Sequence, residues 1–342
     1  MKTIRSTAWA LAAAFALQAE AAPVRYDVKL VASFHNRFSQ PTGLNDAGQV
    51  VGMVVGETAQ GFASGPQGEG LFDPCPPKVA SCTPVGIDAA GDVAMQIIPD
   101  RKRPLSTLGA VAAFDGSNLR YTGDLGSPRT DLWGMSPGGQ LTGMGTTATG
   151  RRHAIFASDA GQPLVDLGVP AGDWNSIGQA VNELGQVAGY LTIADHVQHA
   201  MFALPGGPVR DIGTLGGFTA RASAISANGY VAGFSSQATS SNFHAFACSV
   251  SAPGLVDLGT LGGGLSMAFG VNSAGQVVGQ AERADGSSAA FIVDLHDMTL
   301  VDLNTVADVP RGVTLAIGYA INERGQIAVQ SSDDSVYLLT PR

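Results

Sequence analysis

A phrase of eight residues recurs along nearly the whole chain, and it limits the possible folds more than any other feature of the sequence. Residues 272–279 read Asn-Ser-Ala-Gly-Gln-Val-Val-Gly, and residues 45–52 and 182–189 repeat this order closely. Looser copies bring the total to seven, and the inner glycines of the copies are Gly48, Gly91, Gly139, Gly185, Gly229, Gly275 and Gly325. Their spacing of 43 to 50 residues is the period of a repeat architecture. The chain is therefore predicted to be seven copies of one unit.

Each unit is predicted to contain four short strands. The phrase joins two apolar runs through Asn, Asp or Ser and then Gly, which is the residue order of a hairpin closed by a type I turn and a bulge. A third run begins with His-Ala-Phe or a relative, and a fourth contains Asp-Leu-Gly or an equivalent. The histidines are His153, His199 and His244, and the aspartates are Asp27, Asp124, Asp166, Asp211, Asp257 and Asp302. Four strands in about 40 to 50 residues make one blade of a β-propeller.

The two ends of the chain predict how the ring closes. The last unit stops after its third strand, at residues 335–339, and so lacks the fourth. Residues 25–30, directly before the first unit, have the sequence of that missing strand. We therefore predict an all-β propeller of about seven four-stranded blades. Its N-terminal strand completes the last blade and protects both sheet edges.

The first 21 residues have the order of a signal peptide. Lys2 and Arg5 precede a short apolar stretch at residues 8–17, and Ala19-Glu20-Ala21 is a small-x-small cleavage site. The stretch is too short to favour a membrane span, although a retained N-terminal anchor helix is the alternative. Residues 22–342 are predicted to form a single repeat domain that is exported to the periplasm or the extracellular space.

The charge balance argues against two classes of partner. The net charge is −9, and the sequence has no cluster of Lys and Arg. Such a chain is not expected to bind nucleic acid or anionic membrane surfaces.

Two of the three cysteines lie in a proline-rich stretch. Residues 68–84 read as an insertion that replaces the Asp-Leu-Gly strand of the first unit, and they include Cys75 and Cys82. In an oxidising compartment this pair is expected to form a disulfide; two free thiols or a metal pair are the alternatives. Cys248 lies within a strand and is expected to be a small buried residue.

The repeated histidines and aspartates could suggest a metal site. Equivalent positions in neighbouring blades lie far apart, so we expect instead a His–Asp bond within each blade. The sequence also lacks a calcium loop, a phosphate loop, a dinucleotide fingerprint and a nucleophile elbow. No metal, cofactor or catalytic residue is predicted.

The three phrases together resemble a known family. Asn-x-x-Gly-Gln-Val-Val-Gly, then His-Ala-Phe, then Asp-Leu-Gly-Thr-Leu-Gly-Gly is similar to the bacterial "probable extracellular repeat, HAF family". The match is strongest at residues 182–217, 226–263 and 272–291. The resemblance implies export and a repeat fold, and it supplies no catalytic residues.

The expected function is that of a binding module without catalysis, whose ligand is a glycan or a protein. One alternative is a propeller-fold polysaccharide lyase or glycosidase, in which two acids would converge to within about 5 to 10 Å at the channel mouth. Another is a structural component of the cell surface or matrix.

The ligand is predicted to bind where one blade connects to the next. These connections vary most between units, as binding loops on a rigid scaffold do, and they contain aromatic and Arg residues. The candidate ligand-binding residues are His35, Arg37, Arg129, Asp131, Asp173, Trp174, Phe218, Arg221 and Arg311. Trp174 is the first candidate because an indole in a loop suits stacking on a sugar or a partner.

Overall fold

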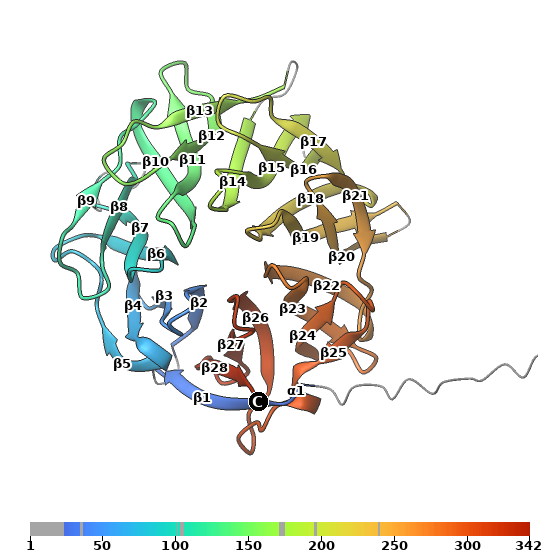
Figure 1. Cartoon of the computed structure of the whole chain (residues 1–342). Coiled ribbons are helices and arrows are strands. Elements are labelled where there is room, and N and C mark those ends of the chain that lie inside the picture. Colours follow the sequence, from blue (N-terminus) through green and yellow to red (C-terminus); the bar gives the residue numbers. More distant parts are fainter. Residues whose placement is uncertain are drawn as a thin grey trace, which may run out of the picture.

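The computed structural model describes residues 24–34, 37–100, 102, 106–170, 175–194, 197–238 and 240–342. The predicted signal peptide lies outside them. The described residues form seven four-stranded antiparallel blades arranged as a ring, and a single parallel bridge between Gln198 and Thr219 joins blades 4 and 5 into one sheet (Figure 1). This arrangement confirms the predicted propeller and its number of blades. Within the described residues, no helix is long and apolar enough to cross a membrane.

In every blade the strands run in order from the channel outwards. Blade 1 contains β2 (Ser39–Leu44), β3 (Val50–Val55), β4 (Ala59–Gly65) and β5 (Glu69–Phe72). Blade 2 contains β6 (Ser81–Ile87), β7 (Asp92–Ile98), β8 (Leu108–Ala113) and β9 (Arg120–Tyr121). Blade 3 contains β10 (Gly126–Met135), β11 (Leu141–Thr147), β12 (Arg152–Ala157) and β13 (Val165–Gly168). Blade 4 contains β14 (Asn175–Val181), β15 (Val187–Ala194), β16 (Val197–Ala203) and β17 (Arg210–Gly213).

The remaining blades follow the same order. Blade 5 contains β18 (Gly216–Ile225), β19 (Tyr230–Gln237), β20 (Ser240–Ser249) and β21 (Ala252–Asp257). Blade 6 contains β22 (Gly262–Val271), β23 (Gln276–Arg283), β24 (Ser288–Asp294) and β25 (Leu300–Asp302). Blade 7 contains β26 (Leu315–Ile321), β27 (Ile327–Ser331), β28 (Val336–Pro341) and β1 (Tyr26–Ala32). Two short helices, η1 (Pro66–Gly68) and α1 (Leu303–Val306), lie in connections.

Strand β1 closes the ring as predicted. It pairs antiparallel with β28, so that Tyr26 lies opposite Pro341 and Val28 opposite Leu339. In Figure 1 the blue β1 lies beside the red β28. Tyr26 is 2% exposed, and its ring belongs to the core that blade 7 shares with α1. The first and last parts of the chain therefore share one sheet and one core.

The repeated phrase folds into the turn between the first and second strand of each blade. In blade 4, Asn182 accepts hydrogen bonds from the N–H groups of Leu184 (3.1 Å) and Gln186 (3.0 Å). Its amide group donates to Gln186 Oε1 (2.7 Å) and to the carbonyl oxygen of Ser226 in blade 5 (2.9 Å). Gly185 has φ 72°, which favours glycine. The phrase thus closes a turn within its blade and bonds to the next blade.

Bonds of this kind join all seven blades around the channel, with lengths between 2.9 and 3.1 Å. We call them the inter-blade belt. Its donors are Asn45, the backbone of Ala89, Gln140, Asn182, Asn228, Asn272 and Asn322, and each donates to a backbone carbonyl of the following blade. The last of them, Asn322 of blade 7, donates to Asn45 of blade 1 and completes the circle. Much of the repeated phrase is therefore explained by assembly of the ring.

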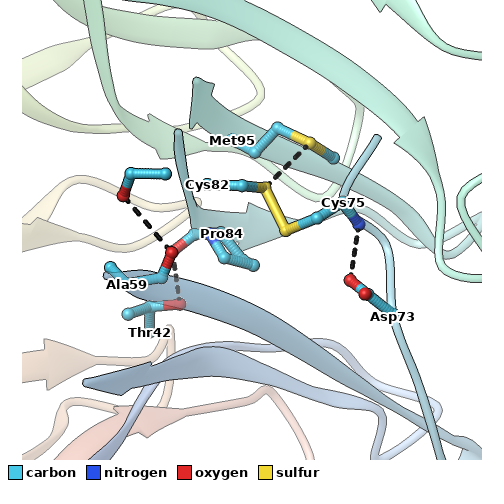
Figure 2. Close-up of a disulfide and its surroundings, with 8 residues drawn as sticks. Thr42, Ala59, Asp73, Cys75, Cys82, Pro84 and Met95 are labelled. Atoms are coloured by element: carbon cyan, nitrogen blue, oxygen red, sulfur yellow. Dashed lines mark hydrogen bonds between the residues drawn. A yellow bond between two sulfur atoms is a disulfide. The ribbon is translucent and has the colours of Figure 1, made fainter. Parts of the chain in front are cut away.

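The predicted disulfide is present and joins Cys75 to Cys82, with a Cα–Cα distance of 6.0 Å. The surrounding stretch differs from the prediction, because residues 68–84 are no insertion. They contain the fourth strand of blade 1, β5, and the first half of β6. Cys82 is 2% exposed, and its Sγ lies 3.7 Å from Sδ of Met95 (Figure 2). The prolines suggested a loop, because proline has no N–H group for a sheet hydrogen bond. Pro84 nevertheless lies in β6, the inner strand of blade 2, whose channel-facing edge has no neighbouring strand and so needs no N–H donor.

Candidate ligand site in the central channel

Each inner strand carries a β-bulge at the same place. In β10, Leu132 lies opposite Gly143 and Gly134 lies opposite Thr142, so that Trp133 has no partner on β11. The same register shift occurs in all seven blades, three residues before the Asn, Asp or Ser of the repeated phrase. The seven bulged residues are Thr42, Val85, Trp133, Gln179, Ser223, Phe269 and Tyr319. A bulge re-aims a side chain and bends its strand.

The last glycine of the phrase accommodates this bend. A Cβ atom at Gly143 would lie 2.0 Å from the carbonyl oxygen of Asp131, and one at Gly189 would lie 1.9 Å from that of Ile177. Blades 1, 5 and 6 have the same close approach. Blades 2 and 7 have Met95 and Val329 at the equivalent place and still carry the bulge, so the glycine eases the bend and does not cause it.

All seven bulged residues line one cavity of about 370 Å³. The other lining residues are the last residues of the inner strands and the start of the Asn turns that follow. The cavity therefore occupies the end of the channel at which the inner strands finish. Its volume lies at the lower end of the range of small-molecule sites, about 300 to 1,000 Å³.

Three of the bulged residues are aromatic and are together called the aromatic wall, although Trp133 of blade 3 lies across the ring from Phe269 and Tyr319 of blades 6 and 7. Trp133 is 45% exposed, which is unusual for the indole of a soluble β-domain. The rings of Phe269 and Tyr319, from blades 6 and 7, lie 5.3 Å apart and tilted. Burial raises the pKa of Tyr319 to about 12, so its hydroxyl remains protonated at neutral pH. The wall therefore offers three uncharged aromatic rings.

Carboxylates lie at the mouth of the cavity. Asp46, Glu183 and Glu323 are exposed and occupy equivalent places, one residue after the Asn of the phrase. Glu323 accepts hydrogen bonds from N–H (3.0 Å) and Oγ of Ser273 (3.0 Å), and Asp46 accepts one from N–H of Glu323 (3.0 Å). Among the described lining residues there is no Lys, Arg or His. The mouth is therefore acidic and lacks positive charges that would neutralise it.

The repeated histidines are placed as expected, each bonded to the aspartate of its own blade. The distances from histidine Nδ1 to carboxylate oxygen are 2.9 Å for His153–Asp166, 2.8 Å for His199–Asp211 and 2.9 Å for His244–Asp257. Blade 6 uses Arg283 and Asp302 instead, 2.7 Å apart. These pairs hold the fourth strand of the blade to its inner neighbours. In the described part of the chain, no group of three or more His, Cys, Asp and Glu is arranged to hold a metal ion.

None of the described residues predicted to bind a ligand lines this cavity. Arg129, Asp131, Phe218 and Arg221 lie within the inner strands β10 and β18, two to five residues before the bulged residues Trp133 and Ser223. The prediction that they lie in connections between blades was wrong. Leu125 and Leu215 form bridges to the second strand of their blades, which draws the connections into the sheet. The other described candidates, Arg37 and Arg311, are exposed in connections, whereas His35, Asp173 and Trp174 lie outside the described residues.

Three of the predicted binding residues, Arg129, Asp131 and Arg221, are engaged within the protein. The guanidinium of Arg221 lies 4.6 Å from the ring centre of Tyr190, and its Nε donates to Oε1 of Gln198 (2.8 Å). Asp131 is 4% exposed and accepts hydrogen bonds from Thr107 and from Nε of Arg129 (3.0 Å). Phe218 is 77% exposed. The sequence did contain a weak indication of the residues that line the channel. The residue three positions before the repeated phrase varies from blade to blade, although the strand around it is repetitive.

Comparison with known proteins identifies the architecture. No family model and no curated protein matches the chain, so the resemblance to the HAF repeats stays a prediction. The β-propeller domain of the Trilobed protease from Pyrococcus furiosus is similar over 86% of this chain and 91% of its own, at 8% identity and TM-score 0.54. An oligogalacturonate lyase from Vibrio parahaemolyticus is similar over 93% and 97%, at 8% identity and TM-score 0.57. A GH74 enzyme from Niastella koreensis is similar over 91% and 53%, at 10% identity and TM-score 0.57. At such identities the likeness shows the fold alone, and the fold is a β-propeller.

Proposed function

We propose that this protein is an exported β-propeller that binds a small ligand at the end of its central channel, without catalysing a reaction. The observation that carries the proposal is the ring of seven bulged residues. The backbone repeats at these positions while the side chains differ, from Ser223 to Trp133. A concave cavity lined mostly by apolar and aromatic side chains with a few polar groups among them is typical of a small-molecule site.

The aromatic wall supports binding in a second way. An indole that is 45% exposed within a concave site offers a large apolar face together with an N–H donor. Covering that face by a ligand removes it from water, which is favourable by roughly 25 cal/mol per Å² of apolar surface. The half-exposed Trp133 is therefore the expected anchor.

Export is proposed from the sequence of residues 1–21 and from the disulfide, since disulfides persist in oxidising compartments. Mass spectrometry of the protein recovered outside the cytoplasm should find an N-terminus at Ala22. An uncleaved protein that remains in the cytoplasm would contradict export.

Trp133 itself provides the binding assay. The sequence has three tryptophans, of which Trp9 lies in the predicted signal peptide. The variant W9F/W174F leaves Trp133 as the only one, whether or not that peptide has been cleaved. A screen of oligosaccharides, amino acids and organic amines should find at least one compound that changes its fluorescence saturably. Isothermal titration of the wild-type protein should give the same affinity. If no compound alters either signal, the channel is not a ligand site.

The matched control also tests the site predicted from the sequence. In the variant W9F/W133F the only tryptophan is Trp174. A ligand bound in the channel should leave this second reporter unchanged. A response from Trp174 alone would instead move the site to the connection that carries it.

A propeller-fold carbohydrate-active enzyme is the second candidate. It is favoured by the carboxylates at the cavity mouth, because glycosidases use pairs of Asp and Glu. Two of the similar structures are described as an oligogalacturonate lyase and a GH74 enzyme. The test is an assay of reducing ends released from a panel of polysaccharides, in which activity should be lost in Glu183→Gln. A wild-type protein that releases none would exclude this candidate.

A further inference from the structure

We propose that the ligand of the channel is a small organic cation, an aliphatic ammonium group recognised by the aromatic wall and the acidic mouth. This inference rests on the proposed function, since it names the chemical class bound by the same cavity.

The first argument is the combination of aromatic faces. A cation placed over an aromatic ring, within about 6 Å of its centre, is attracted by the negative face of the ring, and Trp provides the strongest such attraction. Trp133, Phe269 and Tyr319 line one cavity from three blades, and the last two rings lie 5.3 Å apart. Tyr319 is uncharged at neutral pH, as a tyrosine ordinarily is, and burial raises its pKa further, to about 12. Its ring can therefore act as a neutral face.

The second argument is the sign of the charge. Asp46, Glu183 and Glu323 lie at the mouth of the cavity, and no basic side chain is found among its described lining residues. A cleft lined by charges of one sign concentrates ligands of the opposite sign, and the net charge of −9 adds to the effect. A free anion would be repelled. A neutral sugar would gain hydrogen bonds but nothing from the charge itself.

The third argument is how two of these carboxylates are held. Glu323 accepts hydrogen bonds from Ser273, and Asp46 accepts one from the backbone of Glu323. Each of these two carboxylates is thus held in place at the rim by a donor from the neighbouring blade, Glu323 by Ser273 of blade 6 and Asp46 by the backbone of blade 7. Carboxylates that are already oriented need little further ordering to receive a cation at the mouth. The volume of about 370 Å³ limits it to a small molecule.

Two pairs of matched probes test the charge directly. Choline is compared with its neutral isostere 3,3-dimethylbutan-1-ol, and 1,5-diaminopentane with pentane-1,5-diol. Affinities are measured through Trp133 in W9F/W174F and by titration calorimetry. At least one cation should bind about tenfold or more tightly than its neutral partner. Its affinity should fall as the ionic strength rises from about 0.05 M to about 0.5 M, because salt screens exposed carboxylates.

A pair of variants tests the acidic mouth. Glu183→Gln keeps the shape of the side chain and removes its charge, so affinity for the cation should fall about threefold or more. The control is Glu57→Gln, at an exposed position in the hairpin between β3 and β4, far from the lining residues. It should leave affinity unchanged. Equal melting temperatures of the two variants would show that folding is not responsible.

The outcomes separate the two proposals. Equal binding of cation and neutral isostere, or saturable binding of a neutral oligosaccharide without any response to the cations, would overturn the cation inference and leave ligand binding standing. An absence of response to every compound would overturn both. A tenfold preference that Glu183→Gln reduces and Glu57→Gln does not would support both.

Discussion

Asp88 is the residue at which blade 2 departs from the repeated phrase, and it shows what the Asn at this position contributes in four other blades. Its Oδ1 accepts hydrogen bonds from N–H of Ala90 (2.9 Å) and Asp92 (2.8 Å), as an Asn would. A carboxylate has no N–H to donate to the next blade. The pKa of Asp88 is raised above its usual value, chiefly because the carboxyl is partly buried. Hydrogen bonds from backbone N–H groups oppose this rise, and the charge of Asp92 adds to it.

Replacing this aspartate should stabilise the ring. Asp88→Asn removes a partly buried charge and supplies a donor for the belt, so the free energy of unfolding at pH 7 should rise by about 1 kcal/mol. A raised pKa in the folded state means that the wild-type carboxyl is tolerated best when protonated, at pH below its unfolded value. The gain should therefore be full above the folded-state pKa, shrink as pH falls through it, and be smallest below the unfolded value. Urea unfolding at pH 7 and pH 3.5 measures both; a gain that is independent of pH would contradict the account.

At the scale of the element, the disulfide fixes the short connection between blades 1 and 2. It ties the segment after β5 to the inner strand β6 across seven residues. Its removal in Cys75→Ala/Cys82→Ala should cost about 2 to 3 kcal/mol, because a short loop regains its freedom in the unfolded chain. Wild-type protein reduced with dithiothreitol is the matched control, and both should melt at a similar, lower temperature.

Counting thiols checks the same bridge without any substitution. Burial raises the pKa of Cys248 to about 12, so this thiol should resist alkylation until the protein unfolds. Denatured, unreduced protein should then contain one reactive cysteine. Three would rule out the bridge.

Sequence analysis succeeded where structure depends on local chemistry. The turn of residues 182–185 requires an acceptor and a glycine at fixed places, and both are visible in the sequence. Strand β5 was missed because Gly-Leu-Phe replaces Asp-Leu-Gly there. The cavity was missed for a deeper reason. A bulge at Trp133 exists only in the register between two strands, and a cavity exists only where seven such strands meet.

At the scale of the whole molecule, the ring depends on the pairing of β1 with β28. Removal of residues 22–31 would expose the edge of β28 and take Tyr26 from the core of blade 7. The loss of that aromatic side chain alone costs about 3 to 5 kcal/mol in a packed core. The truncated protein should therefore melt at a much lower temperature or fail to fold.

The control for this truncation keeps the strand and changes only its surface. Leu30 is 51% exposed on β1, so Leu30→Lys should leave the melting temperature within a few degrees of wild type. A truncated protein that melts cooperatively at an unchanged temperature would show that the ring does not need its N-terminal strand.

The seven bulges also bear on how such a protein could acquire new ligands. Each bulged residue stands outside the ladder of its own blade. Apart from Val85, which packs against the core of blade 3, and Thr42, which donates to Pro84 of blade 2, the bulged residues take no part in the cores or in the belt. A substitution at one of these positions can therefore alter the interior of the channel while the assembly of the ring is left intact. The side chains that line the cavity can therefore change one at a time, and with them the ligand that is bound, while the fold stays the same.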